Sequence, residues 1–140
     1  MTDRAFIDTN VFVYVYDEQE PIKRAIALRL IERAGRDGSV ISTQVLSEFY
    51  VALTRRLRPP VGQEVTSAAV QDLLRLDVVP VDADLVLGAI ERLKQHQLSY
   101  WDSLIIGAAA RAGCVLLLTE DLHHGAIIDG VRIENPFLTG

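Results

Sequence analysis

The chain lacks the features of a disulfide-bonded, zinc-binding or membrane-spanning protein. Its one cysteine, Cys114, cannot form an internal disulfide and has no second cysteine at metal-ligand spacing. The histidines are His96 and the adjacent pair His123-His124, which do not complete a zinc site with a cysteine that lies in an apolar run. No stretch approaches the ~18 consecutive apolar residues of a spanning helix. We therefore expect no structural disulfide, no zinc and no membrane association.

Positive charge is also scarce. The chain has 14 Lys and Arg against 19 Asp and Glu, and its formal net charge is −5. This balance argues against a general nucleic-acid binder, which usually carries a basic surface. It is a weak argument if the acids gather in a site that binds cations. The start, Met1-Thr2-Asp3-Arg4, has no basic segment followed by a long apolar stretch, so we expect no secretory signal and a cytoplasmic protein.

The length and the pattern of apolar runs favour one α/β domain over residues 1–140. Short apolar runs alternate with stretches of helical periodicity, which predicts βαβ units and a mostly parallel sheet covered on both faces. This is a three-layer α/β/α sandwich. An Asp129-Gly130 turn predicts a final hairpin or edge strand, and Thr43 and Asp82 are expected helix caps. The expected strands are 5–8, 39–41, 78–81 and 115–118, and the expected helices are 11–16, 21–35, 43–57, 63–75, 82–97 and 99–112.

Four acids occupy positions where strands end or helices begin. Asp8 closes the first apolar run, at the carboxyl end of a strand, where open parallel sheets bind ligands. A lone carboxylate buried there needs a partner or a metal. Asp121 follows the last core strand, and Glu48 and Asp102 lie early in two helices. If the first and last core strands are neighbours, the carboxylates converge.

Each acid also has an ordinary structural interpretation. Asp8 suits the cap of the following helix, and Ser99-Tyr100-Trp101-Asp102 matches a capping box. Glu48 suits a solvated helix position or an ion pair with Arg55, two turns later on the same face. Capping does not exclude function, because a carboxylate has two oxygens and several lone pairs. The aromatic residues Tyr100 and Trp101 are expected in the core or at an interface rather than as platforms for base stacking, although Tyr100, near the site, suits either role.

A cluster of the four acids would require a counter-charge. At a separation of ~5 Å and an effective dielectric constant of about 20, each like-charged pair costs on the order of 3 kcal/mol. Protons or a divalent cation must offset that repulsion. Ligands that are all oxygen favour Mg²⁺ or Mn²⁺ over zinc. Such an ion activates water and stabilises charge at a phosphoryl group, so the acids predict a phosphodiester hydrolase.

In order and separation, five short motifs resemble the PIN-domain ribonucleases, and within them the VapC-type toxins of bacterial toxin–antitoxin pairs. The resemblance runs from residue 6 to residue 137. The motifs are Phe6-Ile7-Asp8-Thr9-Asn10, Leu46-Ser47-Glu48-Phe49, Trp101-Asp102-Ser103-Leu104-Ile105, Leu118-Thr119-Glu120-Asp121-Leu122 and Asn135-Pro136-Phe137.

This resemblance implies a PIN fold with strand order 3-2-1-4-5 and RNA cleavage that depends on Mg²⁺ or Mn²⁺. By position it implies that four acids bind the metal and carry catalysis, and that three polar residues support them. Many relatives have Asn where this chain has Glu120, which leaves open whether that residue or its neighbour faces the metal. The implied acids are Asp8, Glu48, Asp102 and Asp121, and the supporting residues are Thr9, Asn10 and Thr119.

The resemblance also implies partners. The family typically forms homodimers, and a small VapB-type antitoxin blocks the site and binds promoter DNA, which the toxin reaches only through the antitoxin. The RNA target and the number of metal ions stay open. Arg55 and Arg56 suit either contact with RNA phosphates or a solvated helix end, where cations complement the helix dipole.

Three alternative functions compete with this one. A phosphatase of the haloacid-dehalogenase type needs a second Asp where this chain has Asn10, and a response-regulator receiver needs a late Lys, but no Lys follows Lys94. The stronger alternative is a non-catalytic PIN-like module that binds RNA or a protein. Only the intact set of acids argues against it.

Overall fold

A six-stranded sheet forms the centre of the computed structural model, which describes residues 4–138. The strand order is β3-β2-β1-β4-β6-β5, and every neighbouring pair is parallel except β5 and β6. The α/β class and the mostly parallel sheet are confirmed. The expected order 3-2-1-4-5 holds for the first four strands. The fifth place in the sheet is taken by β6, and β5 pairs with the outer edge of β6. The strands are β1 (Ala5–Ile7), β2 (Val40–Ser42), β3 (Asp77–Val79), β4 (Leu116–Leu118), β5 (Ile127–Ile128) and β6 (Val131–Glu134).

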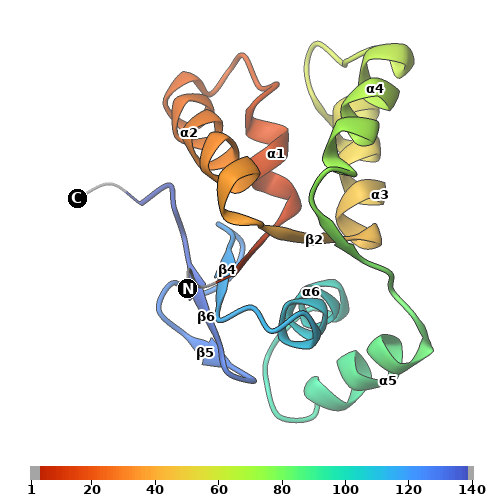
Figure 1. Ribbon diagram of the computed structural model, residues 1–140, viewed down its shortest axis with the longest axis vertical. Helices are drawn as coiled ribbons and strands as arrows, with labels where there is room; N and C mark the ends of the chain where they lie inside the picture. Colours follow the sequence, from red (N-terminus) through yellow and green to blue (C-terminus); the bar gives the residue numbers. More distant parts are fainter. Residues whose placement is uncertain (1–3, 139–140) are drawn as a thin grey trace.

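Helices cover both faces of this sheet. Figure 1 shows α1 to α4 on one side and α5 and α6 on the other. α6 packs against β2, β4 and β6, and α5 packs on the outside of α6. No helix within residues 4–138 combines the length and the apolarity needed to cross a bilayer. The helices are α1 (Thr9–Tyr14), α2 (Pro21–Asp37), α3 (Thr43–Val51), the π-helical segment η1 (Ala52–Arg56), α4 (Gln63–Leu73), α5 (Ala83–Arg92) and α6 (Tyr100–Arg111).

The core lies where the sheet meets these helices. Phe6 and Ile7 of β1, Ile41 of β2 and Leu117 of β4 are almost completely buried. Consecutive buried residues of this kind are typical of parallel strands covered on both faces. At the edge, Asp129 and Gly130 have positive φ values of 52° and 79°, as a two-residue hairpin between β5 and β6 requires.

Several helix boundaries differ from those expected. The first helix, expected over 11–16, spans Thr9–Tyr14, and α4 ends at Leu73 rather than residue 75. Ser42, and not Thr43, caps α3, because the Ser42 hydroxyl accepts from the backbone N–H of Val45 at 3.5 Å. The Thr43 hydroxyl accepts from the N–H of Val81 instead and ties α3 to the segment after β3. α5 ends at Arg92 rather than near residue 97. The expected cap Asp82 does bind the N–H of Leu85 at 3.0 Å.

Candidate active site

The site begins where β1 and β4 end side by side. These strands are parallel, with Ile7 opposite Leu118, and the N–H of Asp8 donates to the carbonyl of Leu118 at 3.0 Å. The residues that follow the two strands, Asp8 and Thr119, therefore lie together at the carboxyl edge of the sheet. Both are buried, with exposed fractions of 4% and 0%.

Hydrogen bonds engage both oxygens of the Asp8 carboxylate. Oδ1 accepts from the backbone N–H of Thr9 at 2.7 Å, which is the helix-capping contact expected for α1. Oδ2 accepts from the hydroxyl of Thr119 at 2.8 Å. That hydroxyl in turn accepts from Asn10 Nδ2 at 3.2 Å and from the N–H of Asp121 at 3.1 Å. One buried hydroxyl thus links Asp8 to the loop that carries Asp121.

Side chains from α1 and α3 orient the other acids. The Thr9 hydroxyl donates to Glu48 Oε1 at 2.9 Å, and Asn10 Nδ2 donates to Asp121 Oδ2 at 3.1 Å. Gln44, one helical turn before Glu48, donates to its Oε2 at 3.4 Å. Glu48 is half-buried and is therefore neither a freely solvated residue nor an ion-pair partner of Arg55 within the described chain.

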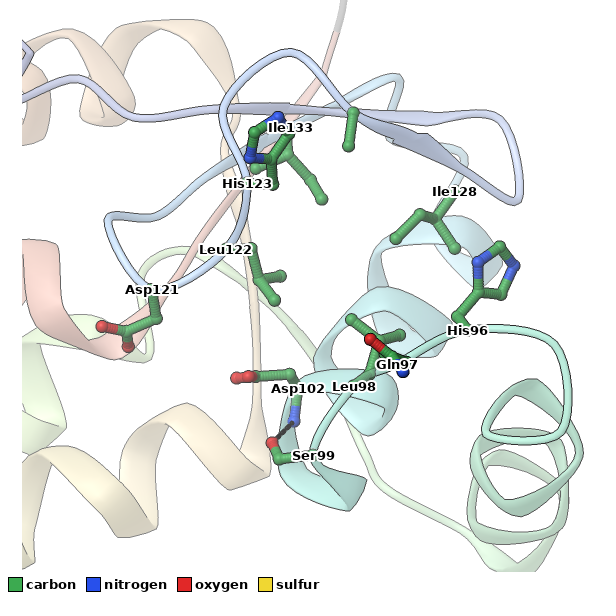
Figure 2. Close-up of a pocket in the computed structure, with 11 residues that line it drawn as sticks. His96, Gln97, Leu98, Ser99, Asp102, Asp121, Leu122, His123, Ile128 and Ile133 are labelled. Atoms are coloured by element: carbon green, nitrogen blue, oxygen red, sulfur yellow. Dashed lines mark hydrogen bonds between the residues drawn. The ribbon is translucent and has the colours of Figure 1, made fainter.

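All four acids line one cavity of about 290 Å³, together with Asn10 and Gln44. Asp102 and Asp121 also border a second, larger groove, and Figure 2 shows them at one end of it with His96 at the other. Asp102 reaches this position from the first turn of α6, where its N–H donates to the hydroxyl of Ser99 at 3.0 Å. Ser99 therefore caps α6 as expected, and the Asp102 carboxylate lines the cavity.

The four carboxylates surround the cavity without closing on a common point. Among residues 4–138, no three His, Cys, Asp or Glu side chains lie close enough together to hold an ion in their present positions. In the same part of the chain, none of the four acids forms an ion pair with Lys, Arg or His. Mutual repulsion of uncompensated carboxylates favours such a separation.

The protonation of Asp8 reflects this lack of a counter-charge. Burial raises its pKa to about 7, against the lowering effect of the hydrogen bonds from Thr119 and Thr9. The charges of Asp121 and Glu48 raise it further. Burial also raises the pKa of Asp102, opposed by the hydrogen bond with Ser99 and reinforced by the same two charges. The charges of Asp121 and Glu48 therefore act on both Asp8 and Asp102.

The oxygen atoms around this cavity that could bind a metal fit a hard divalent cation. Every candidate ligand is oxygen, and the most buried one is a carboxylate with no cationic partner in the described chain. The Asn10 Oδ1 atom is also buried and has no hydrogen-bond partner among residues 4–138. A cation would oppose both the burial and the neighbouring charges that raise the pKa values of Asp8 and Asp102.

The structure distinguishes Glu120 from Asp121. The carboxylate of Glu120 accepts from the Tyr14 hydroxyl and from Lys23 Nζ, the latter at 3.0 Å. The hydrogen bonds that Lys23 Nζ donates to Glu120 and to the Tyr14 hydroxyl raise the pKa of Lys23, so the ammonium remains charged. Asp121, in contrast, lines the cavity and is held by Asn10. The acid that faces the cavity is therefore Asp121.

A π-turn decides which arginine reaches the site. The helix expected over 43–57 keeps α geometry to Val51 and then widens, so that the N–H of Leu57 donates to the carbonyl of Ala52, five residues earlier. In a continuous α-helix Arg55 would follow Glu48 on the same face after two turns. The wider turn takes one more residue, and Arg56 lines the acidic cavity while Arg55 borders a separate one.

Two residues near the site were missed or misplaced by sequence reasoning. Gln44 was not singled out, although its spacing of four residues from Glu48 places both on one helix face. Trp101 was expected in the core or at an interface; its side chain is 59% exposed, which excludes the core, while the interface stays a prediction. The flanking Asp102 and Ser103 take up the inward positions at the start of α6, which leaves Trp101 on the outer side.

Comparisons with known proteins agree with this fold. The PIN domain family model matches residues 5–127. The VapC20 toxin of Mycobacterium tuberculosis, which cleaves the sarcin–ricin loop, is 25% identical over 81% of this chain and 86% of its own, with a TM-score of 0.66. A toxin–antitoxin complex from Klebsiella pneumoniae shares the fold, with 19% identity over 94% of this chain and 97% of its own and a TM-score of 0.70. DNA-bound VapBC from Salmonella typhimurium does so as well, with 20% identity over 96% of this chain and 99% of its own and a TM-score of 0.67. No curated protein shows significant sequence similarity to the chain.

Proposed function

Because the chain belongs to the PIN-domain family, we propose that it is a metal-dependent endoribonuclease and the toxin of a toxin–antitoxin pair. The observation that carries this proposal is the acidic cavity at the carboxyl edge of β1 and β4. Five carboxylates line it, those of the four candidate ligands and of Asp17, and none of the five forms an ion pair within the described chain. Such a cavity suits a hydrolase that acts on phosphodiesters, because a bound divalent ion offsets the charge repulsion between acidic residues and an anionic substrate.

Asp8, Glu48, Asp102 and Asp121 would hold Mg²⁺ or Mn²⁺. When bound, the ion would supply an activated water and neutralise charge at the phosphorus. The residues of the chain prepare the site for it. Thr119 orients Asp8, and the Thr9 hydroxyl orients Glu48, through the hydrogen bonds described above. Second hydrogen bonds of this kind fix the direction in which a ligand oxygen points.

Two further side chains extend the site. Asn10 holds Asp121 toward the cavity through its Nδ2 atom. Arg56 is the arginine at the rim of the cavity and would contact a phosphate of the substrate. The site therefore combines acids for an ion with one cation for the RNA backbone.

We extend the proposal to the partners by analogy with the structural relatives. Several of these relatives are toxin–antitoxin complexes, one of them bound to a promoter DNA fragment. We propose that this chain forms a homodimer as one domain over residues 1–140 and that a VapB-type antitoxin covers its acidic cavity in the cytoplasm. Contact with promoter DNA would then be made by the antitoxin.

Incubation of the purified protein with single-stranded RNA tests the proposal. We expect cleavage with Mg²⁺ or Mn²⁺, none with EDTA, and none for Asp8→Asn in either condition. Asp72→Asn, which changes an exposed carboxylate on α4, serves as the matched control and should cleave normally. RNA binding without cleavage in every condition would instead identify a non-catalytic PIN-like module.

A further inference from the structure

The only tryptophan of the chain lies beside the acidic cavity and is open to solvent. Trp101 directly precedes Asp102 in the first turn of α6, and its side chain is 59% exposed. A large aromatic side chain in this position contributes little to the core. Its place next to a candidate metal ligand requires another explanation.

Trp101 borders a cavity of about 520 Å³ that adjoins the acidic one. Val51 and Leu104 give it apolar walls, while Gln44, Glu48 and Arg56 line both cavities. Its volume lies within the range of ~300–1,000 Å³ that is usual for small-molecule sites. A molecule bound beside the indole would therefore be continuous with one that reaches the carboxylates.

One neighbouring side chain packs against the indole, and another holds the backbone that carries it. The Tyr100 ring packs against it in a T-shaped arrangement, with centroids 5.0 Å apart and an interplanar angle of 76°. Gln44 Nε2 donates to the carbonyl of Trp101 at 3.1 Å and to Glu48 at 3.4 Å. One buried amide thus ties the backbone at Trp101 to an acid of the candidate site. These two contacts limit the conformational freedom that the indole would lose on binding.

We propose that Trp101 and this cavity form a subsite for one nucleobase of single-stranded RNA, next to the phosphate that is cut. The subsite rests on the proposed ribonuclease function. Unpaired bases stack on aromatic side chains in single-stranded recognition, whatever their sequence. Arg56, shared by the two cavities, supplies the positive charge that the adjoining phosphate needs. This pairing of an apolar face with one cation fits a nucleotide better than an acidic or purely apolar peptide.

Trp101 fluorescence tests the subsite directly, because no other tryptophan contributes to the signal. The probe is a six-nucleotide oligoadenylate, titrated into the wild-type protein in EDTA and into Asp8→Asn in Mg²⁺, so that no cleavage intervenes. We expect saturable quenching. An oligonucleotide of the same length and charge but with abasic sugars should give none.

Cleavage kinetics supply the second readout. Trp101→Ala should raise KM for RNA by about 5- to 100-fold and leave kcat within about threefold, as expected for the loss of one stacked base. Trp101→Phe should restore most of the affinity. Leu87→Ala, at a residue that is 63% exposed on α5, is the control for removal of an exposed apolar side chain.

The outcomes separate this subsite from the proposed function. Cleavage with an unchanged KM in Trp101→Ala, or equal quenching by the abasic oligonucleotide, would overturn the subsite and leave the nuclease intact. Base-dependent quenching without cleavage by the wild-type protein would support the subsite and reject the nuclease. Quenching by an antitoxin peptide but not by RNA would show that the cavity binds protein, and would overturn the subsite.

Discussion

Substitution of Asp8 by Asn should stabilise the metal-free protein at pH 8. Burial raises the pKa of Asp8 to about 7 from an ordinary value of 3.8. Below about pH 4 both the folded and the unfolded chain hold the proton. Between about pH 4 and 7 the folded chain keeps it while the unfolded chain releases it, so stability falls as the pH rises. Above pH 7 the full penalty applies, which is at most about 4 kcal/mol for three pKa units.

The amide introduced by Asp8→Asn would remove this penalty and lose part of the hydrogen bonding. Its Nδ2 atom would face the Thr119 hydroxyl, which already accepts two hydrogen bonds, so one interaction worth about 1 kcal/mol is lost. The expected net gain at pH 8 is about 3 kcal/mol. That corresponds to an increase in Tm of roughly 6–12 °C. Near pH 4.5 the gain should largely vanish.

Thermal or urea unfolding in EDTA at pH 4.5, 6 and 8 provides the assay. Asp72→Asn is the control for removal of an exposed negative charge. Addition of Mg²⁺ or Mn²⁺ should stabilise the wild-type protein, by about 2.7 kcal/mol at one hundred times the Kd, and should affect Asp8→Asn much less. An Asp8→Asn variant that is no more stable than wild type at pH 8 in EDTA would refute the electrostatic reasoning.

Three other predictions test single contacts. Asp121→Asn should reduce RNA cleavage at least about tenfold, because Asp121 lines the cavity. Glu120→Gln should lower Tm by breaking the contact with Lys23 and should leave the rate of cleavage unchanged. An equal loss of activity in both variants would contradict the assignment. In a plot of log affinity for RNA against log salt concentration, Arg56→Ala should reduce the slope by about one unit, and Arg55→Ala should leave it unchanged. An unchanged slope in Arg56→Ala would show that Arg56 does not contact the RNA. The Cys114 thiol, whose pKa burial raises to about 11, should react with disulfide reagents at pH 8 only after unfolding, and rapid reaction of the native protein would contradict its burial.

Much of the fold could be predicted because local patterns and the tertiary structure agree. The apolar runs around Ile7 and Leu117 became neighbouring buried strands, and the Asp129-Gly130 turn formed the hairpin. The capping residue Ser99 also has the expected contact. These features depend on residues close in sequence, or on the rule that parallel strands end at the same edge of a sheet.

The details that sequence reasoning missed depend on contacts between distant segments. The π-turn at Ala52 shifts the helix register by one residue, so Arg56 and not Arg55 reaches the cavity. No local periodicity indicates such a turn. The separation of Glu120 from Asp121 likewise depends on Lys23, nearly one hundred residues earlier in the chain.

The exposure of Trp101 has a similar cause. An aromatic residue at the start of an apolar helix is usually buried, but here the inward positions belong to Asp102 and the buried Ser103. Which of these residues point inward depends on the rotation of α6 against the sheet. That rotation is a property of the packing and is not encoded in the local pattern.

The arrangement of an ion between the carboxylates is the most direct test of the whole account. Crystals of the protein grown with Mn²⁺ should show an anomalous peak in the cavity between Asp8 and the other three acids, with their oxygens drawn toward it, and no such peak in Asp8→Asn. A wild-type structure at saturating Mn²⁺ with those side chains still apart and no metal among them would contradict it.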